Sequence, residues 1–496
     1  MKKLLVLVMT LALSVIASRQ LGASAAAAPA SPIRHVVIVM EENHSFDDIF
    51  GKFCAEVAAG QIVRAGPDDR CHGATVATLK NGSQRALGRE PDFGLNLDHS
   101  VAGQQSVMDG GKMDGWDVDK HCRVNDSPAY ACLTQFDPLS GTCGSHRNQN
   151  CTPNLDLEAE QYAISDRTFE FRATPSWAGH MVLGSATVEH FLGENPTKRQ
   201  KDPGGDTGWG CDAGKSTPWY LSGRSGPTTN IPSCIPDRTG SLGPAWQSYS
   251  GTKADYVPTI FDRLDAAHLS WRIYYDEGAR STSAAGWAIC PSFWECLGSP
   301  QHDDAVDDKQ FFPDAEAGLP AVSIVVPPAG SSAHQPASVS AGDAWVGRVV
   351  QATMASPSWP STAIFVSFDD CGCFYDDVNP LQYTVDWGPR VPMVIVSPYA
   401  KPGFTDSTPA TSVSMLTFIE RTFGLLPLNP CATEDSWDPH CTDDARDYNG
   451  QQTYDFSNAF DFSGVQAGRV PFVRVGVPRR EKAWLAAHPL AGNEAT

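Results

Sequence analysis

The sequence lacks any long apolar run beyond its first 25 residues. No later stretch approaches the roughly 20 apolar residues that a membrane-spanning helix needs, so the sequence predicts no integral membrane segment. The early run, from Leu4 to Ala17, is itself too short to span a bilayer. It follows Lys2 and Lys3 and gives way to small residues up to Ala25, which is the pattern of a secretory signal peptide. We therefore expect residues 1–25 to be removed and the chain to be secreted, extracellular or periplasmic.

Basic residues are also scarce. The chain has 37 Lys and Arg against 57 Asp and Glu, a formal charge of -20, and loss of Lys2, Lys3 and Arg19 takes it to about -23. No Lys/Arg-rich tract interrupts this balance, which disfavours nucleic acid as a partner. An anionic ligand would need a local positive charge, such as a metal ion or a histidine.

No linker rich in Pro or Ser divides the chain, and no internal repeat is present. We predict one elaborated catalytic domain over residues 33–427, with residues 428–496 as a C-terminal extension packed on it.

Cysteine, in contrast, is plentiful, and the 14 residues all follow the signal segment. This number suits an oxidising compartment. Neighbours in sequence suggest short-range disulfides, although sequence alone does not determine connectivity. The expected pairs are Cys54–Cys71, Cys122–Cys132, Cys143–Cys151, Cys211–Cys234, Cys290–Cys296 and Cys431–Cys441.

Short apolar runs rich in β-branched residues alternate with helical patterns, which predicts an α/β fold with a mostly parallel central sheet flanked by helices. Cys- and Gly-rich stretches over about 52–155 and 194–250 are expected to be disulfide-stapled insertions. The predicted strands are His35–Met40, Ser270–Tyr274, Ala321–Val326, Thr362–Phe368 and Val391–Val396, and the predicted helices are Trp177–Thr187, Thr259–Ala267, Ala344–Met354 and Ser412–Phe423.

Two of these strands run directly into acidic groups. The first leads into Glu41-Glu42-Asn43 and another into Asp369-Asp370. Parallel strands end at one edge of a sheet, where the carboxylates would repel one another unless a cation lay between them. Each group taken alone fits a helix cap or a solvated turn equally well. The two together predict a divalent metal site.

Ser176 follows Pro175 at the expected start of a helix. Its hydroxyl has two interpretations: a cap for that helix, or a metal-activated nucleophile beside the positive end of the helix dipole. His99, His180 and His334 are further candidates, although a lone histidine is more often structural.

The residues His35 to Gly51, HVVIVMEENHSFDDIFG, resemble a motif of the bacterial phospholipase C and acid phosphatase family, the phosphoesterase branch of the alkaline phosphatase superfamily. Similar landmarks follow in order up to about residue 427. They are Asp98-His99-Ser100, Gly111-Lys112-Met113-Asp114-Gly115, Arg172-Ala173-Thr174-Pro175-Ser176, His334-Gln335-Pro336 and SFDDCGCFYDDV.

The resemblance implies a hydrolase acting on phosphoric ester bonds. Its metal ligands would be Glu42, Asn43, Ser176, Asp369 and Asp370. Ser176 would be the nucleophile, with Thr174 as the lesser alternative, and His99 and His334 would contact the phosphate. An oxygen-rich ligand set favours a hard cation such as Ca, Mg or Mn and leaves zinc and iron as alternatives.

The chain departs from the family pattern at Cys371-Gly372-Cys373, at Thr411-Ser412-Val413-Ser414 and at Ala178-Gly179-His180. These departures leave the substrate open between a small phosphomonoester and a phospholipid head group. Trp287, Phe293 and Trp294 would form an apolar rim for lipid or pack beneath a stapled loop. Many phospholipases of the resembled family carry extra C-terminal domains, and we expect no such domain after about residue 430. This difference favours a smaller phosphate ester as the substrate.

Two alternatives come from other functional classes. Cys234-Ile235-Pro236-Asp237-Arg238 fits the Cys-x-Pro-x-Arg core that sulfatases convert to formylglycine, but Cys234 also has a plausible disulfide partner in Cys211. A non-catalytic secreted protein that binds a metal or another ligand is the other alternative.

Overall fold

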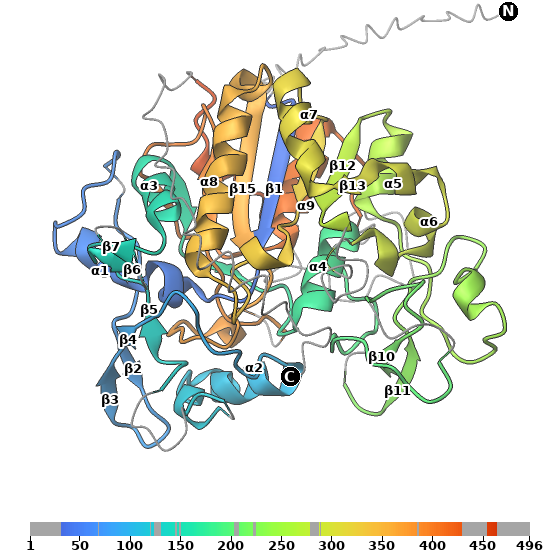
Figure 1. The fold of residues 1–496 in the computed structure, drawn as a ribbon, viewed down its shortest axis with the longest axis horizontal. Coiled ribbons are helices and arrows are strands. Elements are labelled where there is room, and N and C mark those ends of the chain that lie inside the picture. The colour runs from blue at the N-terminus through green and yellow to red at the C-terminus, as the bar shows by residue number, and fades with distance from the viewer. Residues whose placement is uncertain are drawn as a thin grey trace, which may run out of the picture.

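An eight-stranded sheet forms the centre of the molecule, in the order β13-β12-β14-β1-β15-β16-β8-β17 (Figure 1). The computed structural model describes residues 31–428 and 454–463, except for 68, 120, 124–129, 144–145, 148–149, 203–207, 222–224, 278–286, 288 and 384–385. The predicted signal peptide, most of the predicted C-terminal extension and the expected Cys431–Cys441 pair lie outside the described residues.

The strands of this sheet are β1 (His35–Glu41), β8 (Ala163–Ser165), β12 (Trp271–Tyr275), β13 (Ala305–Asp307), β14 (Val322–Val325), β15 (Thr362–Phe368), β16 (Met393–Val396) and β17 (Thr405–Asp406). Smaller pairs outside the sheet are formed by β2 (Val76–Thr78) with β3 (Gln84–Ala86), β4 (Gly88–Arg89) with β5 (Thr134–Gln135), β6 (Thr142–Cys143) with β7 (His146–Arg147), β9 (Thr168–Phe169) with β18 (Ala410–Thr411), and β10 (Ser216–Tyr220) with β11 (Thr228–Pro232).

The described α-helices are α1 (Lys52–Ala58), α2 (Val101–Met108), α3 (Pro153–Gln161), α4 (Ser176–Ser185), α5 (Ile260–Ala266), α6 (Trp294–Leu297), α7 (Phe311–Ala317), α8 (Val339–Ala355) and α9 (Val413–Phe423). All five predicted strands and all four predicted helices are present, with shifts of a few residues at their ends. The predicted α/β class with a mostly parallel sheet is therefore confirmed.

One predicted strand runs against its neighbours. β16 pairs antiparallel with both β15 and β8, whereas the other strand pairs of the sheet are parallel. The apolar run in β16 is buried on both faces, like a parallel strand, so its sequence pattern did not reveal its direction.

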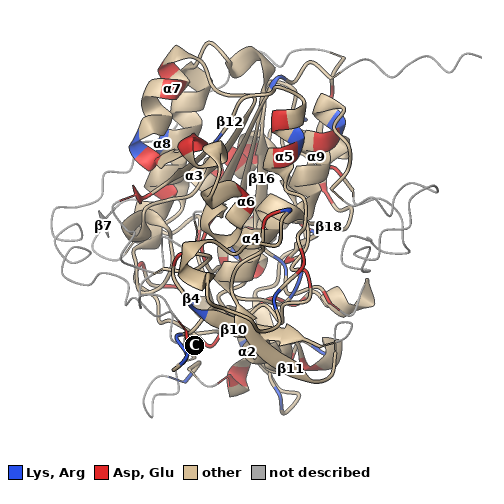
Figure 2. Cartoon of the chain, turned by 90° about the vertical axis from the view of Figure 1, so that its right-hand side faces the viewer, with Lys and Arg blue, Asp and Glu red and all other residues tan. Residues whose placement is uncertain are grey.

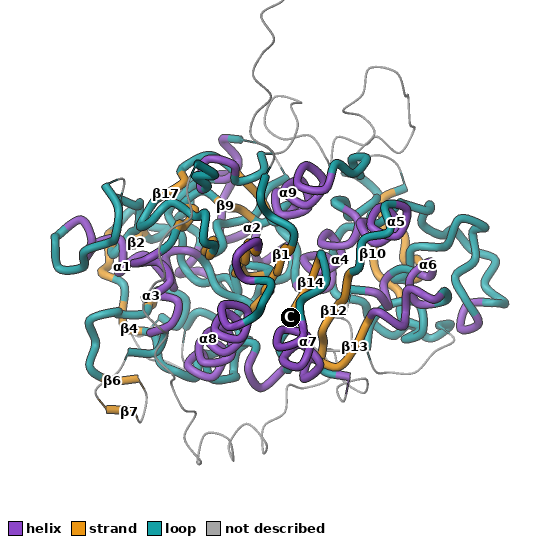
Figure 3. The backbone as a smooth tube through the Cα atoms, turned by 90° about the horizontal axis from the view of Figure 1, so that it is seen from above, coloured by secondary structure: helices purple, strands orange, loops and turns teal. Residues whose placement is uncertain are grey.

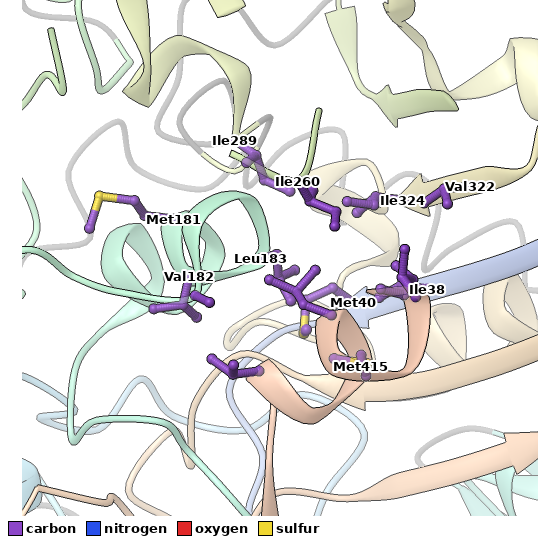
Figure 4. Close-up of a cluster of buried hydrophobic side chains, with 14 of the residues drawn as sticks. Ile38, Met40, Met181, Val182, Leu183, Ile260, Ile289, Val322, Ile324 and Met415 are labelled. Atoms are coloured by element: carbon purple, nitrogen blue, oxygen red, sulfur yellow. The ribbon is translucent and has the colours of Figure 1, made fainter. Parts of the chain in front are cut away.

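A hydrophobic core covers each face of the sheet, and successive side chains of β1 point alternately into the two cores. Val36, Ile38 and Met40 enter a core that includes side chains of α4, α5 and α9, whereas Val37 and Val39 enter a core that includes α1, α3, α7 and α8. Figure 3 views these layers from above, with α5 and α9 on one side of the strands and α7 and α8 on the other. Figure 4 shows Ile38 and Met40 facing Leu183 of α4 and Met415 of α9. This packing holds α4 close to the end of β1.

Disulfides staple the insertions around this α/β core. Five of the expected bonds are present: Cys54–Cys71, Cys122–Cys132, Cys143–Cys151, Cys211–Cys234 and Cys290–Cys296. Over the same described ranges, no helix has both the length and the apolar character to cross a bilayer. Figure 2 shows segments with Lys or Arg interspersed with acidic ones on the side that it presents.

Candidate active site

The ends of β1 and β15 bring the predicted acidic groups together. The two strands pair in parallel from His35 and Thr362 to Glu41 and Phe368, so the residues that follow each strand meet at the same edge. The backbone N–H of Asn43 donates to Oδ1 of Asp369 at 2.9 Å and ties the two ends to each other. Asn43 has a φ of 61°, a left-handed conformation that Asn tolerates better than most residues. Glu42, Asn43, Asp369 and Asp370 are all buried.

Ser176 lies in this acidic group as the first residue of α4. Its Oγ donates to Oε2 of Glu42 at 2.9 Å and lies 3.5 Å from Oδ1 of Asn43. The N-cap position of α4 belongs to Pro175, and the hydrogen bonds of the Ser176 hydroxyl go to Glu42 and Asn43, which favours the interpretation of Ser176 as a site residue over that of a simple cap. Thr174 donates instead to the carbonyl of Arg172 at 3.4 Å. The geometry therefore favours Ser176 over Thr174.

The start of α4 is secured by a neighbouring loop. Asn195 Oδ1 accepts from the backbone N–H of Trp177 at 2.9 Å, which satisfies one of the first N–H groups of the helix. Gly179 allows α4 to lie close to β15, because a Cβ there would come within 3.2 Å of the Asp369 carbonyl oxygen.

His180 joins the site one turn beyond Ser176. Its Nε2 lies 2.5 Å from Oε1 of Glu42 and 3.8 Å from Oδ2 of Asp369. Residues four apart share one face of a helix, so Ser176 and His180 contact the two oxygens of the same Glu42 carboxylate. The sequence marked His180 as a candidate only through this spacing.

The donor set fits a divalent cation. One ligand atom each from Glu42, His180 and Asp369 lies within 4.8 Å of the others, and all three side chains are fully or almost fully buried. Burial raises the pKa of Asp369, but His180 and hydrogen bonds from Glu42, Ser176 and the Asn43 backbone outweigh burial and hold that pKa below its ordinary value. An ionised carboxylate in so enclosed a place is a suitable ligand for a metal ion.

Asp370 is oriented differently from Asp369. Its Oδ1 accepts from the backbone N–H of Gly372 at 2.6 Å, and it is outside the group of three residues whose ligand atoms cluster. The structure therefore brings Glu42, Asn43, Ser176 and Asp369 into mutual contact and places Asp370 beside them.

The two histidines expected to contact phosphate lie side by side. The rings of His99 and His334 have centroids 5.9 Å apart, and Nε2 of His99 lies 3.4 Å from Nδ2 of Asn43. Each ring donates from Nδ1 to a backbone carbonyl, of Leu97 in one case and of Gln335 in the other. This arrangement leaves Nε2 as the basic nitrogen of each neutral ring.

Trp287 lies between two of the site histidines. It stacks on His180 with centroids 6.1 Å apart and on His334 with centroids 5.8 Å apart. Of the three residues expected to form a rim for lipid or to pack beneath a loop, Trp287 and Phe293 are buried and form no exposed rim. Trp294 is partly buried and packs against the cluster around the Cys211–Cys234 disulfide.

Sequence reasoning missed a second buried layer behind the site. Nδ1 of His44 lies 2.5 Å from Oδ2 of Asp48, and burial lowers the pKa of His44 to about 3. Burial and the nearby Asp343 and Asp369 raise the pKa of Glu41 well above its ordinary value. Glu41 therefore does not join Glu42 at the rim, because the strand alternation sends the two side chains to opposite faces.

A further acidic cluster has a structural explanation. Ligand atoms of Asp47, Asp376 and Asp377 also lie within 4.8 Å of one another. The buried Arg390 occupies this cluster, since its Nη2 lies 3.1 Å from Asp47 and 3.2 Å from Asp377 and its Nε lies 2.9 Å from Asp376. This network ties the Phe374–Asp377 loop, which follows β15, to the segment after β1.

Cys234 is bonded to Cys211 and buried. A disulfide leaves no thiol at this position for conversion to formylglycine, so the sulfatase alternative is not supported.

These features define a candidate active site at the carboxyl edge of a mostly parallel sheet, with a serine inside a buried acidic group. The profile of the phosphoesterase family matches residues 33–426, and the chain belongs to that family.

Similar proteins include a non-hemolytic phospholipase C of Pseudomonas aeruginosa, 28% identical over 237 residues, which are 38% of this chain and 32% of that protein. Phospholipase C A of Mycobacterium tuberculosis is 22% identical over 447 residues, 81% of this chain and 75% of that protein. The matched segments span about a third of the length of the Pseudomonas relative. Among solved structures, an alkaline phosphatase superfamily protein from Vibrio parahaemolyticus matches at 14% identity and a TM-score of 0.32, covering 76% of each chain.

Proposed function

We propose that the protein is a secreted hydrolase that cleaves phosphate esters through Ser176. The observation that carries the proposal is the 2.9 Å approach of the Ser176 hydroxyl to Glu42 within a buried acidic group at a helix start. Membership of the phosphoesterase family supports it, as do relatives whose names are phospholipase C. Five disulfides among the described residues and the signal-like N-terminus support export.

A divalent cation would be held by Glu42, Asn43, Ser176, Asp369 and Asp370. When bound, it would lower the pKa of the serine hydroxyl and polarise the phosphoryl group. An oxygen-rich set of this kind favours a hard ion.

The residues of the chain itself would orient the nucleophile, stabilise the developing charge and supply protons. Glu42 and Asn43 orient the Ser176 hydroxyl, and the positive end of α4 faces the charge that develops on the phosphoryl oxygens. Attack by Oγ on phosphorus breaks the bond to the ester oxygen and forms a phosphoserine, and the Oγ proton passes to the Glu42 carboxylate that accepts its hydrogen bond. A His99 or His334 ring protonated at Nε2 would give its proton to the leaving oxygen, which departs as the alcohol, and water then hydrolyses the phosphoserine.

A small phosphomonoester, of the acid phosphatase type, ranks ahead of a phospholipid head group in this proposal. Trp287, which stacks on two of the site histidines, and Phe293 are buried and offer no exposed apolar surface to a lipid chain.

The deciding experiment is hydrolysis of an aryl phosphomonoester, an aryl phosphocholine diester and an aryl sulfate, each with and without chelator. Ser176→Ala is compared with wild type, and Thr174→Val is the matched control. We expect monoester cleavage that requires both metal and Ser176, with turnover reduced by about a thousandfold or more in Ser176→Ala. Full activity of Ser176→Ala would overturn the nucleophile, and metal binding with no cleavage of any substrate would favour a non-catalytic binding protein.

A further inference from the structure

His180 contacts the same carboxylate as the nucleophile, from the same helix. Ser176 Oγ donates to Oε2 of Glu42, and His180 Nε2 lies 2.5 Å from Oε1 of that residue. The same nitrogen lies 3.8 Å from Oδ2 of Asp369. Two ligand atoms bound to one ion at about 2.0 to 2.2 Å lie roughly 3 Å apart, so an ion here would replace the hydrogen between Nε2 and Oε1 and widen their separation from 2.5 Å.

The imidazole is held firmly in this position. His180 is fully buried, it lies within α4, and its ring stacks on Trp287 at an interplanar angle of 14°. Gly179, the preceding residue, brings this part of α4 against the backbone of Asp369. The ring therefore already faces the acidic group, and only a small widening of the distance between Nε2 and Oε1 would be needed to admit an ion.

We propose that Nε2 of His180 is itself a ligand of the cation, so that the site is a mixed nitrogen and oxygen site. This inference rests on the proposed function, since it concerns the same cation. Imidazole suits Zn and Fe much better than Ca, Mg or Mn, which prefer oxygen. A histidine ligand would therefore raise the preference of the site for a transition metal such as Zn over the hard ion that the oxygen ligands alone favour.

The test measures metal affinity, not turnover. Zn(II), Mn(II) and Ca(II) are titrated against a chromophoric chelator in wild type, His180→Gln and the control His302→Gln, whose histidine is half-buried in a surface 3-10 turn. We expect His180→Gln to lose at least tenfold in Zn affinity while Ca affinity changes by less than threefold. An equal loss for Zn and Ca would overturn the proposal, because His180 would then only orient Glu42 through a hydrogen bond. Unchanged affinity for both ions would overturn it as well.

A second measurement needs no His180 variant and remains decisive if that variant does not fold. Electron spin echo modulation of the Mn(II)-loaded wild type, with and without ¹⁵N-histidine labelling, detects a coordinated imidazole. His99→Gln and His334→Gln are included, and both should keep the signal if His180 is its source. A wild type without any imidazole modulation would overturn the proposal. An imidazole signal in a protein that cleaves no phosphate ester would preserve the ligand and reject only the proposed function.

Discussion

Gly372 packs directly against the backbone of Asn43. A Cβ atom on Gly372 would come within 2.1 Å of the Asn43 carbonyl oxygen and 3.0 Å of its Cβ, and Gly372 has a φ of 53°. Two independent constraints, close approach and left-handed backbone, therefore require glycine at this position. The loop after β15 can reach the loop after β1 because this residue has no side chain.

Gly372→Ala should disturb the site more than the fold. The added methyl group must push Asn43 away from Ser176 and Asp369, because the backbone atoms that it meets cannot move separately. We expect kcat to fall at least tenfold and metal affinity to fall with it, as measured by steady-state kinetics and chelator competition. Gly330→Ala is the matched control, since a Cβ there meets nothing within 4 Å. Equal, near-normal activity of both variants would contradict this account of the loop.

The paired histidines make a prediction about leaving groups. If Nε2 of His99 or His334 protonates the departing oxygen, a poor leaving group depends on it more than a good one. We expect His99→Gln and His334→Gln to reduce kcat/KM for an alkyl phosphate by about 100-fold. The reduction for a nitrophenyl phosphate, whose leaving oxygen needs little protonation, should be less than tenfold. Equal losses for both substrates in both variants would assign the two rings to phosphate binding and not to proton transfer.

The buried Arg390 predicts a large effect on stability. Replacing it with Met leaves Asp47 and Asp376 buried without their cationic partner, which typically costs about 3 to 5 kcal/mol. The free energy of unfolding from urea denaturation should fall by about that amount. Arg238→Met is the control, because this side chain is 60% exposed beside Asp262 and Glu295 and exposed pairs contribute about 0 to 1 kcal/mol. Similar losses in the two variants would show that the Arg390 network adds little.

Local patterns predicted the elements well. The run Thr362–Phe368 is β15 with the same bounds, because a short apolar, β-branched stretch between turn residues has few other solutions. The five described disulfides join cysteines no more than 23 residues apart, so neighbours in sequence were also neighbours in space. The strand ends correctly located the acidic group, because strand polarity in a parallel sheet determines which edge collects ligands.

The remaining features depend on contacts between distant segments. His180 and Glu42 are 138 residues apart, and their contact requires α4 to pack on the carboxyl end of β1. Nothing in the spacing of His180 distinguishes such a contact from that of an ordinary core histidine. The reversed direction of β16 likewise follows from the tertiary arrangement, because a run buried on both faces has the same pattern in either direction.

Buried carboxyl groups away from the site predict that the folded state loses stability as the pH rises. Burial raises the pKa of Asp343, Glu194 and Glu420 to about 7. Because the folded pKa lies above the unfolded one, each contribution is fully present below about pH 4 and is lost as the pH rises toward 7. His44 acts in the opposite direction, since its pKa is lowered to about 3 and its contribution is lost as the pH falls below about 6.5.

Glu420→Gln isolates one of these carboxyl groups. Glu420 Oε1 accepts from the backbone N–H of Leu428 at 2.7 Å, and a glutamine oxygen can accept the same hydrogen bond without titrating. We expect the difference in unfolding free energy between pH 5 and pH 8 to shrink by about 1 to 3 kcal/mol in this variant. Urea denaturation at both pH values measures this difference, with the exposed Glu316→Gln on α7 as the control. If Glu420→Gln and Glu316→Gln change the pH dependence equally, Glu420 is ionised in the folded protein near neutral pH, and its partial burial on α9 does not raise its pKa.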